Sequence, residues 1–287
     1  MMANVTSTTV RPHWHGRLNL VYANVQGATQ VIYNHAQAPL KVQRPFYPEG
    51  AEVCHSVILH TAGGVVGGDL LTLDFQLQPQ THALITTPAA SKIYRTNGWE
   101  AHQKIQMQVD TDACLEWLPQ ETIVFDGAVY RQDLRVELAP GATWFGWEIT
   151  RFGRSARNER FLHGNWRSHT EVWQQQRPLW IDRQWLPGNE TTSISPHGLA
   201  GKSVVGSFAM IGHVVSPELV AQVRIPTVED RAQAGVTRLT TGILCRYRGD
   251  STTAARHWFT QVWQLLRLSL LGRPCCLPRV WQVDERY

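Results

Sequence analysis

Apolar and polar residues alternate along much of the chain. Residues 71–78, 104–110, 134–138 and 179–182 each place apolar side chains at every second position. This period of two matches the strand geometry in which successive side chains point to opposite faces of a sheet. The pattern predicts a chain dominated by β-strands.

Three of the predicted strands begin in a similar way. Each follows a turn rich in Pro, Asp, Gly or Thr that ends in an alanine, and these alanines are Ala83, Ala113 and Ala142, separated by 30 and 29 residues. A fixed period of this size is typical of stacked supersecondary units. We therefore expect a helix-like, β-solenoid-like stack of β layers, although turns in any β protein also recur at similar intervals.

Helical signals are confined to the later part of the chain. Residues 216–223 open with Ser and Pro, which predicts a short helix, and residues 252–271 place apolar side chains on one broad face before Gly272 and Pro274. Residues 186–202 have the composition of a long loop. We expect one domain over residues 1–287, with residues 1–12 as a flexible tail and about two α-helices in the C-terminal part.

Composition excludes several classes of protein. The formal net charge is only +4, and the 27 Lys and Arg residues are scattered, which disfavours nucleic-acid binding. Five cysteines without a Cys-x-x-Cys pair indicate reduced thiols in a cytoplasmic protein. The most apolar segment is interrupted by polar residues and is too short to cross a bilayer. We expect neither nucleic acid nor membrane as a partner.

The segment His60-Thr-Ala-Gly63-Gly64-Val-Val-Gly67-Gly68-Asp69 concentrates four glycines and one acid between two predicted strands. Gly63 and Gly68 have the spacing of a phosphate-binding loop, but Asp69-Leu70 replaces the required Lys-Ser/Thr. A dinucleotide fingerprint is excluded because a strand follows instead of a helix. The segment is predicted to be a tight corner that positions Asp69.

Further acids lie in apolar surroundings. Glu116, Glu121 and Asp126 occur within residues 115–127, where a carboxylate must face water or be paired. The cationic segment 151–160 has the charges to pair them. No nucleophile elbow or zinc-protease signature is present. Paired carboxylates leave open a glycoside hydrolase on a β-helical scaffold as an alternative function.

Four stretches, taken together, resemble the urease accessory protein family called UreD or UreH. They are His60-Thr-Ala-Gly-Gly-Val-Val-Gly-Gly-Asp69, Leu84-Ile-Thr-Thr-Pro-Ala-Ala-Ser-Lys-Ile-Tyr-Arg95, Leu115-Glu-Trp-Leu-Pro-Gln-Glu-Thr-Ile-Val-Phe-Asp126 and Gly153-Arg-Ser-Ala-Arg-Asn-Glu159. Departures are few, and Asn158 stands where the family has glycine. Asn tolerates left-handed backbone angles better than other non-glycine residues, so the turn before Glu159 can form.

The resemblance implies a scaffold without catalytic turnover of its own. It would link apo-urease to the accessory protein UreF, which holds the GTPase UreG, and would conduct transient nickel to urease, with no permanently bound cofactor and with dimerisation only inside the accessory complex. Oxygen donors release nickel more readily than imidazole or thiolate clusters. Candidate path residues are Asp69, Glu121 and Glu159, with support from Gly63, Gly64, Gly67, Gly68, Lys92, Tyr94, Arg95, Asp126 and Arg151. The alternative is that Asp69 caps a turn and the other charged residues form ion pairs.

Overall fold

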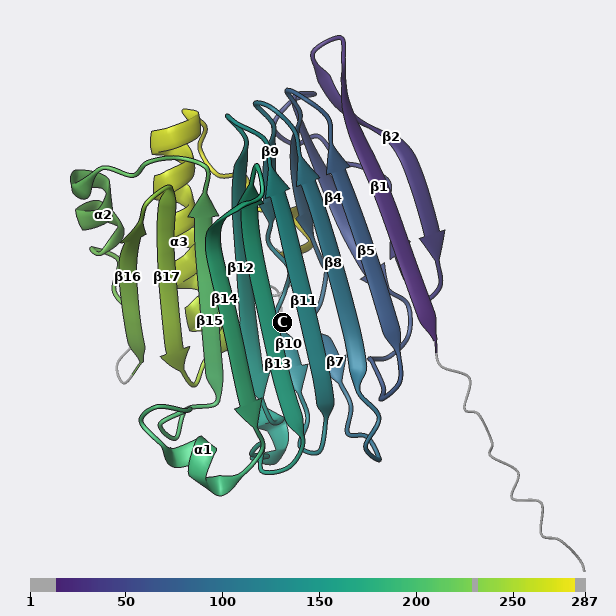
Figure 1. Cartoon of the computed structure of the whole chain (residues 1–287), viewed down its shortest axis with the longest axis vertical. Helices are drawn as coiled ribbons and strands as arrows, with labels where there is room; N and C mark the ends of the chain where they lie inside the picture. The colour runs from purple at the N-terminus through teal and green to yellow at the C-terminus, as the bar shows by residue number, and fades with distance from the viewer. Residues whose placement is uncertain (1–13, 229–231, 282–287) are drawn as a thin grey trace, which may run out of the picture.

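The computed structural model describes residues 14–228 and 232–281, so the predicted tail at residues 1–12 lies outside the described residues. Within these ranges the strands form a seven-stranded sheet and a ten-stranded sheet, with helices beside the larger one (Figure 1). The prediction of a chain dominated by stacked β-strands is confirmed.

Parallel ladders form the centre of both sheets. The seven-stranded sheet contains β5 (Leu70–Leu77), β8 (Ala101–Val109), β11 (Val129–Leu138) and β13 (Asn165–Gln174) in this order. The ten-stranded sheet contains β4 (Val53–His60), β6 (His82–Thr86), β9 (Cys114–Trp117) and β12 (Thr143–Phe152). The chain alternates between these two ladders, so each turn of the solenoid-like stack contributes one strand to each ladder.

In the seven-stranded sheet, β1 (His15–Val25) continues the parallel ladder beside β5. Antiparallel strands flank both ladders, and in this sheet they are β2 (Ala28–Gln37) beside β1 and β14 (Arg177–Pro187) beside β13. The ten-stranded sheet is extended by β3 (Leu40–Val42), β15 (Val204–Ile211), β17 (Gly242–Gly249) and β16 (Gln233–Leu239). Two short strands, β7 (Ser91–Ile93) and β10 (Thr122–Val124), pair in parallel with each other and β10 pairs with the end of β12. They form the bend between the two sheets.

The alanine repeat corresponds to the layers of the stack, with one offset. Ala113 and Ala142 are equivalent, because the next residues, Cys114 and Thr143, are paired in register. Ala83 is not equivalent to them, since His82 is the residue that pairs with Cys114. The residue equivalent to Ala113 in the preceding layer is Thr81, so this layer is two residues longer than the 30 residues inferred from Ala83.

Two of the three helices in the described part of the chain match the predictions. Helix α2 (Pro217–Val223) is capped by Ser216, and α3 (Thr252–Leu271) ends at Gly272, whose φ of +64° suits glycine. A five-residue helix, α1 (Glu190–Ile194), lies in the segment predicted to be a loop, and its N-terminus is capped by Asn189. None of the described helices has the length and apolarity required to cross a membrane.

Two hydrophobic clusters stabilise this arrangement. One lies between the two sheets, and the other lies between the ten-stranded sheet and helices α2 and α3. Central strands of the ten-stranded sheet are therefore largely buried on both faces, and on β12 both Trp144 and Phe145 are buried. The period of two is hidden in such strands because neither face is polar.

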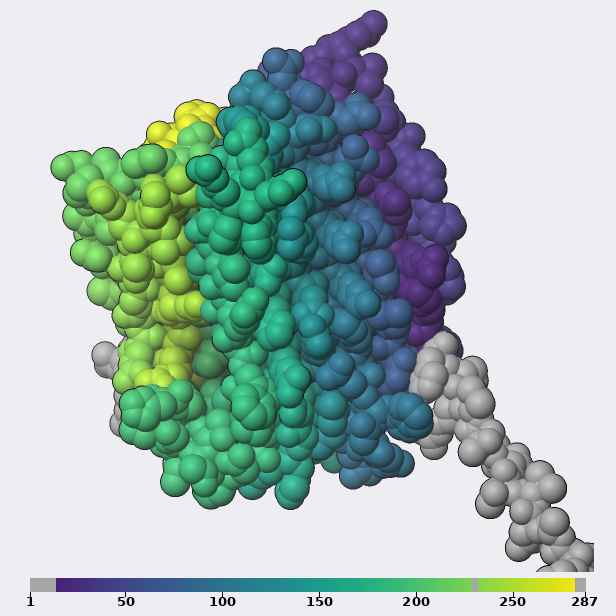
Figure 2. All heavy atoms as spheres, viewed as in Figure 1, coloured from purple at the N-terminus to yellow at the C-terminus, as the bar shows by residue number. Residues whose placement is uncertain are grey.

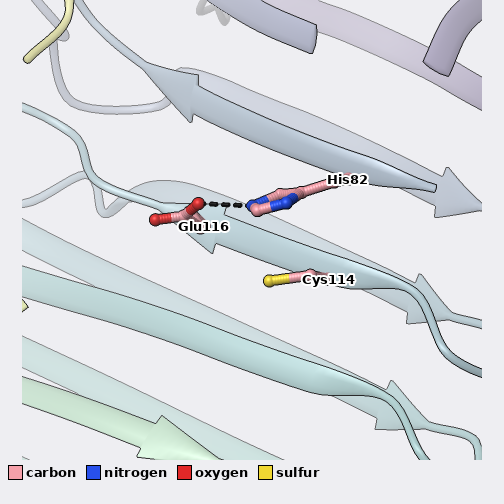
Figure 3. A group of neighbouring side chains, drawn as sticks. All are labelled: His82, Cys114 and Glu116. Atoms are coloured by element: carbon pink, nitrogen blue, oxygen red, sulfur yellow. Dashed lines mark hydrogen bonds and ion pairs between the residues drawn. The ribbon is translucent and has the colours of Figure 1, made fainter. Parts of the chain in front are cut away.

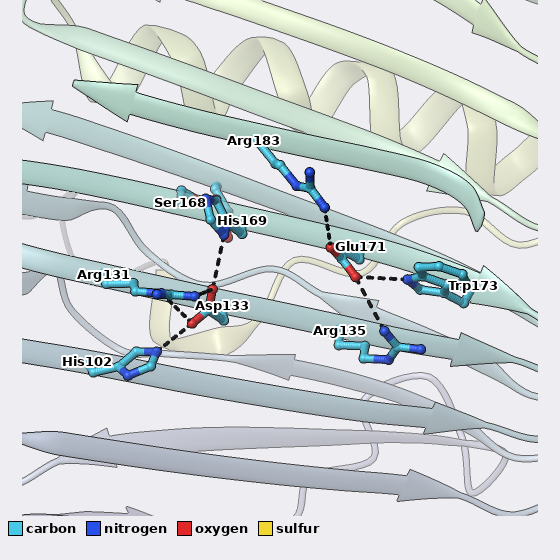
Figure 4. A network of polar contacts seen from close by, with 10 residues as sticks. His102, Arg131, Asp133, Arg135, Ser168, His169, Glu171, Trp173 and Arg183 are labelled. Carbon is cyan, nitrogen blue, oxygen red and sulfur yellow. Dashed lines mark hydrogen bonds and ion pairs between the residues drawn. The ribbon is translucent and has the colours of Figure 1, made fainter. Parts of the chain in front are cut away.

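None of the described helices covers the outer face of the seven-stranded sheet (Figure 2). It carries ion pairs between neighbouring strands, in which Asp133 contacts Arg131, His102 and His169 (Figure 4). Glu171 forms a second group with Arg135 and Arg183. Burial opposes the ionisation of Asp133, but hydrogen bonds from Arg131 and His102 hold the pKa of Asp133 below its usual range.

Candidate functional site

The glycine corner connects β4 to β5, as predicted, and Asp69 stabilises it. The Asp69 side chain is buried, and its Oδ2 accepts a hydrogen bond of 2.9 Å from the backbone N–H of Val66. The backbone carbonyl of Asp69 accepts a hydrogen bond of 2.8 Å from the N–H of His102. Asp69 therefore holds the turn and joins it to the next layer.

Two of the four glycines are required by close packing. A Cβ atom on Gly64 would lie 2.5 Å from Cε2 of Tyr94 and 2.7 Å from the carbonyl oxygen of Lys92. A Cβ on Gly67 would lie 2.6 Å from the carbonyl oxygen of Trp99. The Tyr94 hydroxyl also donates a hydrogen bond of 3.0 Å to the carbonyl of Gly63. The corner thus packs directly on residues 91–99.

Backbone hydrogen bonds bring the sequence motifs together at one end of the stack. Gly68 donates to Glu100, Thr96 donates to Gly127 and Gly127 donates to His163, each at 3.0 Å. The loops that follow β4, β7, β10 and β12 are therefore joined into a single layered edge. The sequence placed these motifs far apart, and the solenoid-like stack places them side by side.

Asp126 and Glu159 meet in this edge. A Glu159 carboxylate oxygen accepts a hydrogen bond of 2.7 Å from the backbone N–H of Asp126, and the other pairs with Arg154. Asp126 Oδ1 accepts hydrogen bonds from the N–H groups of residues 162 and 163 at 2.7 Å. Asn158 adopts a φ of +49°, so the left-handed turn expected before Glu159 is confirmed.

The acids of residues 115–127 are paired, as expected, but their cationic partners were predicted wrongly, and Asp126 pairs with His163 at 2.9 Å. Glu121 pairs with Arg256 of α3 at 3.1 Å, and Glu116 pairs with His82 and with Arg267 of α3. Segment 151–160 supplies neither of these cations because α3 covers this face of the sheet. Two further predicted residues contact no acid side chain in the described ranges: Arg151 donates to the carbonyl of Asp250 at 2.9 Å, and Arg95 is exposed.

A cavity of about 150 Å³ lies between the two sheets, next to the glycine corner. This is many times the roughly 10–15 Å³ needed for one water molecule. Gly63, Gly64 and Lys92 line it. Asp69, Glu121 and Glu159 are not among the lining residues. Their assignment as path residues stays a prediction.

Glu148 of β12 is the carboxylate that lines this cavity. Ser168 of β13 donates a hydrogen bond of 2.7 Å to it, and the amide of Gln132 on β11 donates a second one. The Tyr130 hydroxyl contacts the side-chain oxygens of Gln132 and Gln103 at 3.2 and 3.3 Å. A polar cluster therefore lies inside an otherwise apolar core.

The surroundings of Glu148 favour its protonated form. Burial is the largest cause and raises the pKa of Glu148 to about 7; hydrogen bonding by Ser168 opposes the shift and the charge of Asp182 adds to it. A smaller cavity on the other side of Glu148 is lined by Asp182 and Ser207. Arg246 binds Asp182 through two hydrogen bonds of 2.7 and 2.8 Å. Polar groups thus continue past Glu148 toward β17.

His60 supplies a nitrogen at the same cavity. It lines the cavity at the end of β4, and its Nδ1 lies 3.2 Å from the carbonyl oxygen of Ala62. Because a carbonyl oxygen only accepts, this contact places a proton on Nδ1, and the neutral tautomer with that proton has its lone pair on Nε2. The Nε2 atom is buried and has no hydrogen-bond partner among the described residues. An imidazole held in this way by a backbone carbonyl is typical of metal ligands.

Sequence reasoning missed Glu148 and His60 as site residues, although a signal for the cluster exists. Gln103 of β8, Gln132 of β11 and Ser168 of β13 occupy inward positions among mostly apolar neighbours, and these three are paired in register. A polar residue at the same rung of three consecutive layers indicates a polar site between the sheets. Glu148 gives no such signal because β12 is buried on both faces.

The comparisons with known proteins agree with the fold and the motifs. The family described as UreD urease accessory protein matches residues 15–282. The chain is 65% identical over 279 residues to a protein of Nostoc punctiforme named urease accessory protein UreD, covering 97% of this chain and 100% of that protein. A protein of the same name from Dechloromonas aromatica is 40% identical over 273 residues, covering 94% and 95% of the two chains. The chain therefore belongs to the UreD urease accessory protein family.

Proposed function

We propose that this chain acts in the cytoplasm as a urease maturation factor that conducts nickel to the urease active site. It would do so as a scaffold between apo-urease and UreF, which holds the GTPase UreG, without catalysing a reaction of its own. The observation that carries the proposal is the polar cavity inside the β stack, lined by Glu148 and His60. Family membership supports a role beside urease and gives the glycoside hydrolase alternative no support.

The donor set of the cavity suits a travelling cation. A carboxylate, amide oxygens, hydroxyls and one imidazole can replace part of the water around Ni²⁺, while the absence of thiols from the described cavity lining avoids the strongest retention. Glu148 supplies the negative charge, and its pKa near neutrality allows a proton to leave when the cation arrives and to return when it departs. The ion would thus be bound weakly enough to move on.

The loop edge has a supporting role in this proposal. Asp69 stabilises the turn whose Gly63 and Gly64 line the cavity, and Asp126 and Glu159 stabilise turns of the same loop edge. Asp69→Ala is expected to leave the chain folded and able to bind UreF, yet to lower nickel loading of co-expressed urease. Unchanged nickel content in that urease would remove Asp69 from the path.

Co-expression tests the proposal through Glu148. Urease produced with UreF, UreG and the Glu148→Gln variant should contain several-fold less nickel than urease produced with the unchanged chain. Glu137→Gln is a matched control, because Glu137 lies on β11 and pairs with Arg135 on the uncovered face of the seven-stranded sheet. Both variants should co-purify with UreF. Full nickel content with a folded, UreF-bound Glu148→Gln variant would refute the conduit.

A further inference from the structure

Three side chains with metal-binding atoms converge on the face of the ten-stranded sheet that lies under α3 (Figure 3). His82 on β6 and Cys114 on β9 are paired in register, and Glu116 lies two residues beyond Cys114 on the same face of β9. Glu148 and the cavity lie on the other side of this sheet. The cluster is therefore separate from the proposed nickel route.

The ligand atoms of the cluster are close enough for one ion. His82 Nε2 lies 2.5 Å from Glu116 Oε1, and the His, Cys and Glu ligand atoms all lie within 4.8 Å of one another. Two ligands at about 2.0–2.3 Å from a tetrahedral ion are separated by about 3.3–3.8 Å, so the contacting His82 and Glu116 side chains would move apart by about 1 Å to admit the ion. In the described ranges, these three residues form the one group of three or more His, Cys, Asp and Glu side chains with such proximity.

Neighbouring groups orient the carboxylate. Arg267 Nε lies 3.1 Å from Glu116 Oε1, and the indole N–H of Trp263 donates to the other oxygen. Arg267 also pairs with Glu49 at 2.7 Å, and Glu49 contacts His55 at 2.7 Å. The positive charge of Arg267 is therefore balanced by Glu49 as well as by Glu116. Partners of this kind fix the rotamer of a metal ligand.

We propose that His82 Nε2, Cys114 Sγ and a Glu116 oxygen form a three-ligand site for a divalent ion of the zinc class. Imidazole, thiolate and carboxylate together suit Zn²⁺, and a solvent molecule completes four-coordination in such sites. The ion takes the place of one proton on the imidazolium and one on the thiol, so the charge of the cluster is unchanged when it binds. It links β6 to β9 beneath α3.

Cobalt provides the test, because Co²⁺ occupies zinc sites and a cysteine ligand gives it a charge-transfer absorption in the near ultraviolet. Addition of CoCl₂ to the purified full chain should produce this band with a stoichiometry of one, and ZnCl₂ should abolish it. Cys114→Ser should remove the band. Cys276→Ser should retain it, since Cys276 is a partly exposed thiol outside the cluster. Glu148→Gln should also retain it, which separates this site from the nickel route.

A second variant keeps the test valid if Cys114→Ser fails to fold. His82→Gln leaves the thiol in place and removes the imidazole ligand, so it should weaken cobalt binding at least tenfold. Absence of the band in the unchanged chain, or equal cobalt affinity of a folded Cys114→Ser or His82→Gln variant, would overturn the proposal.

Discussion

Arg267 of α3 lies 3.1 Å from Glu116 of β9, and both side chains have no exposed surface. Each ion has a further partner, because Arg267 also pairs with Glu49 and Glu116 also pairs with His82. A buried charge is costly unless it is paired and hydrogen-bonded. This ion pair therefore joins α3 to β9, and we expect the packing of α3 on the sheet to depend on the pair.

We predict that Arg267→Met strongly destabilises the chain. Removal of one partner of a buried ion pair leaves an uncompensated charge and costs about 3–5 kcal/mol. Chemical denaturation of the purified chain measures this loss. Arg183→Met is the control, because Arg183 pairs with Glu171 on the uncovered face and is 65% exposed, so its loss should cost less than about 1 kcal/mol. Equal stability of the two variants would contradict the role assigned to Arg267.

The glycine corner permits a comparison of two adjacent positions. Gly64→Ala should destabilise the chain by about 1–3 kcal/mol, because the new Cβ would overlap Tyr94 and the backbone oxygen of Lys92. Gly63→Ala should be close to neutral, since its Cβ would have no neighbour closer than the Tyr94 hydroxyl at 3.8 Å. Thermal unfolding of both variants measures the difference. A Gly64→Ala variant as stable as Gly63→Ala would show that the corner is looser than described.

Glu148 should make the stability of the chain depend on pH. Its folded-state pKa of about 7 lies above the roughly 4.3 of an exposed Glu, so between these values the folded chain binds more protons than the unfolded chain. Its contribution to stability therefore falls as pH rises through this window. Glu148→Gln should be more stable than the unchanged chain at pH 8, by about 3–4 kcal/mol, and the difference should shrink at pH 5. Denaturation at the two pH values tests this sign, and lower stability of Glu148→Gln at pH 8 would contradict it.

Hydrophobic periodicity and capping residues predicted the elements whose formation depends on neighbouring residues in the sequence. Helix α3 was located because one apolar face extends over residues 252–271 and Gly272 ends it. The strands of the seven-stranded sheet were visible because one face is polar and the other is buried. Helix α1 was missed because five residues are too few for a periodic pattern, and its Asn189 cap also fits a turn.

The candidate site depends on the register between neighbouring strands, which cannot be deduced from a single sequence. Gln103, Gln132 and Ser168 become neighbours only when three strands are aligned, and Glu148 faces them across the core. The predicted acids were chosen as oxygen donors, and Asp69 in particular for its place next to glycines. The structure shows that Asp69 holds its turn through the N–H of Val66. The sequence motifs identified the loops at the edge of the stack. The cavity could not be predicted from them, because it forms only when the strands of the two sheets are aligned.

Nickel transfer in the presence of a chelator tests the central claim most directly. Complexes of this chain with UreF and nickel-loaded UreG would be mixed with apo-urease, GTP and a large excess of a chelator that captures any nickel released into solution, and nickel bound to urease would be counted. The account predicts that the unchanged chain still loads urease and that Glu148→Gln does so several-fold more slowly. Complete loss of loading by the unchanged chain when the chelator is present would contradict an enclosed path through this protein.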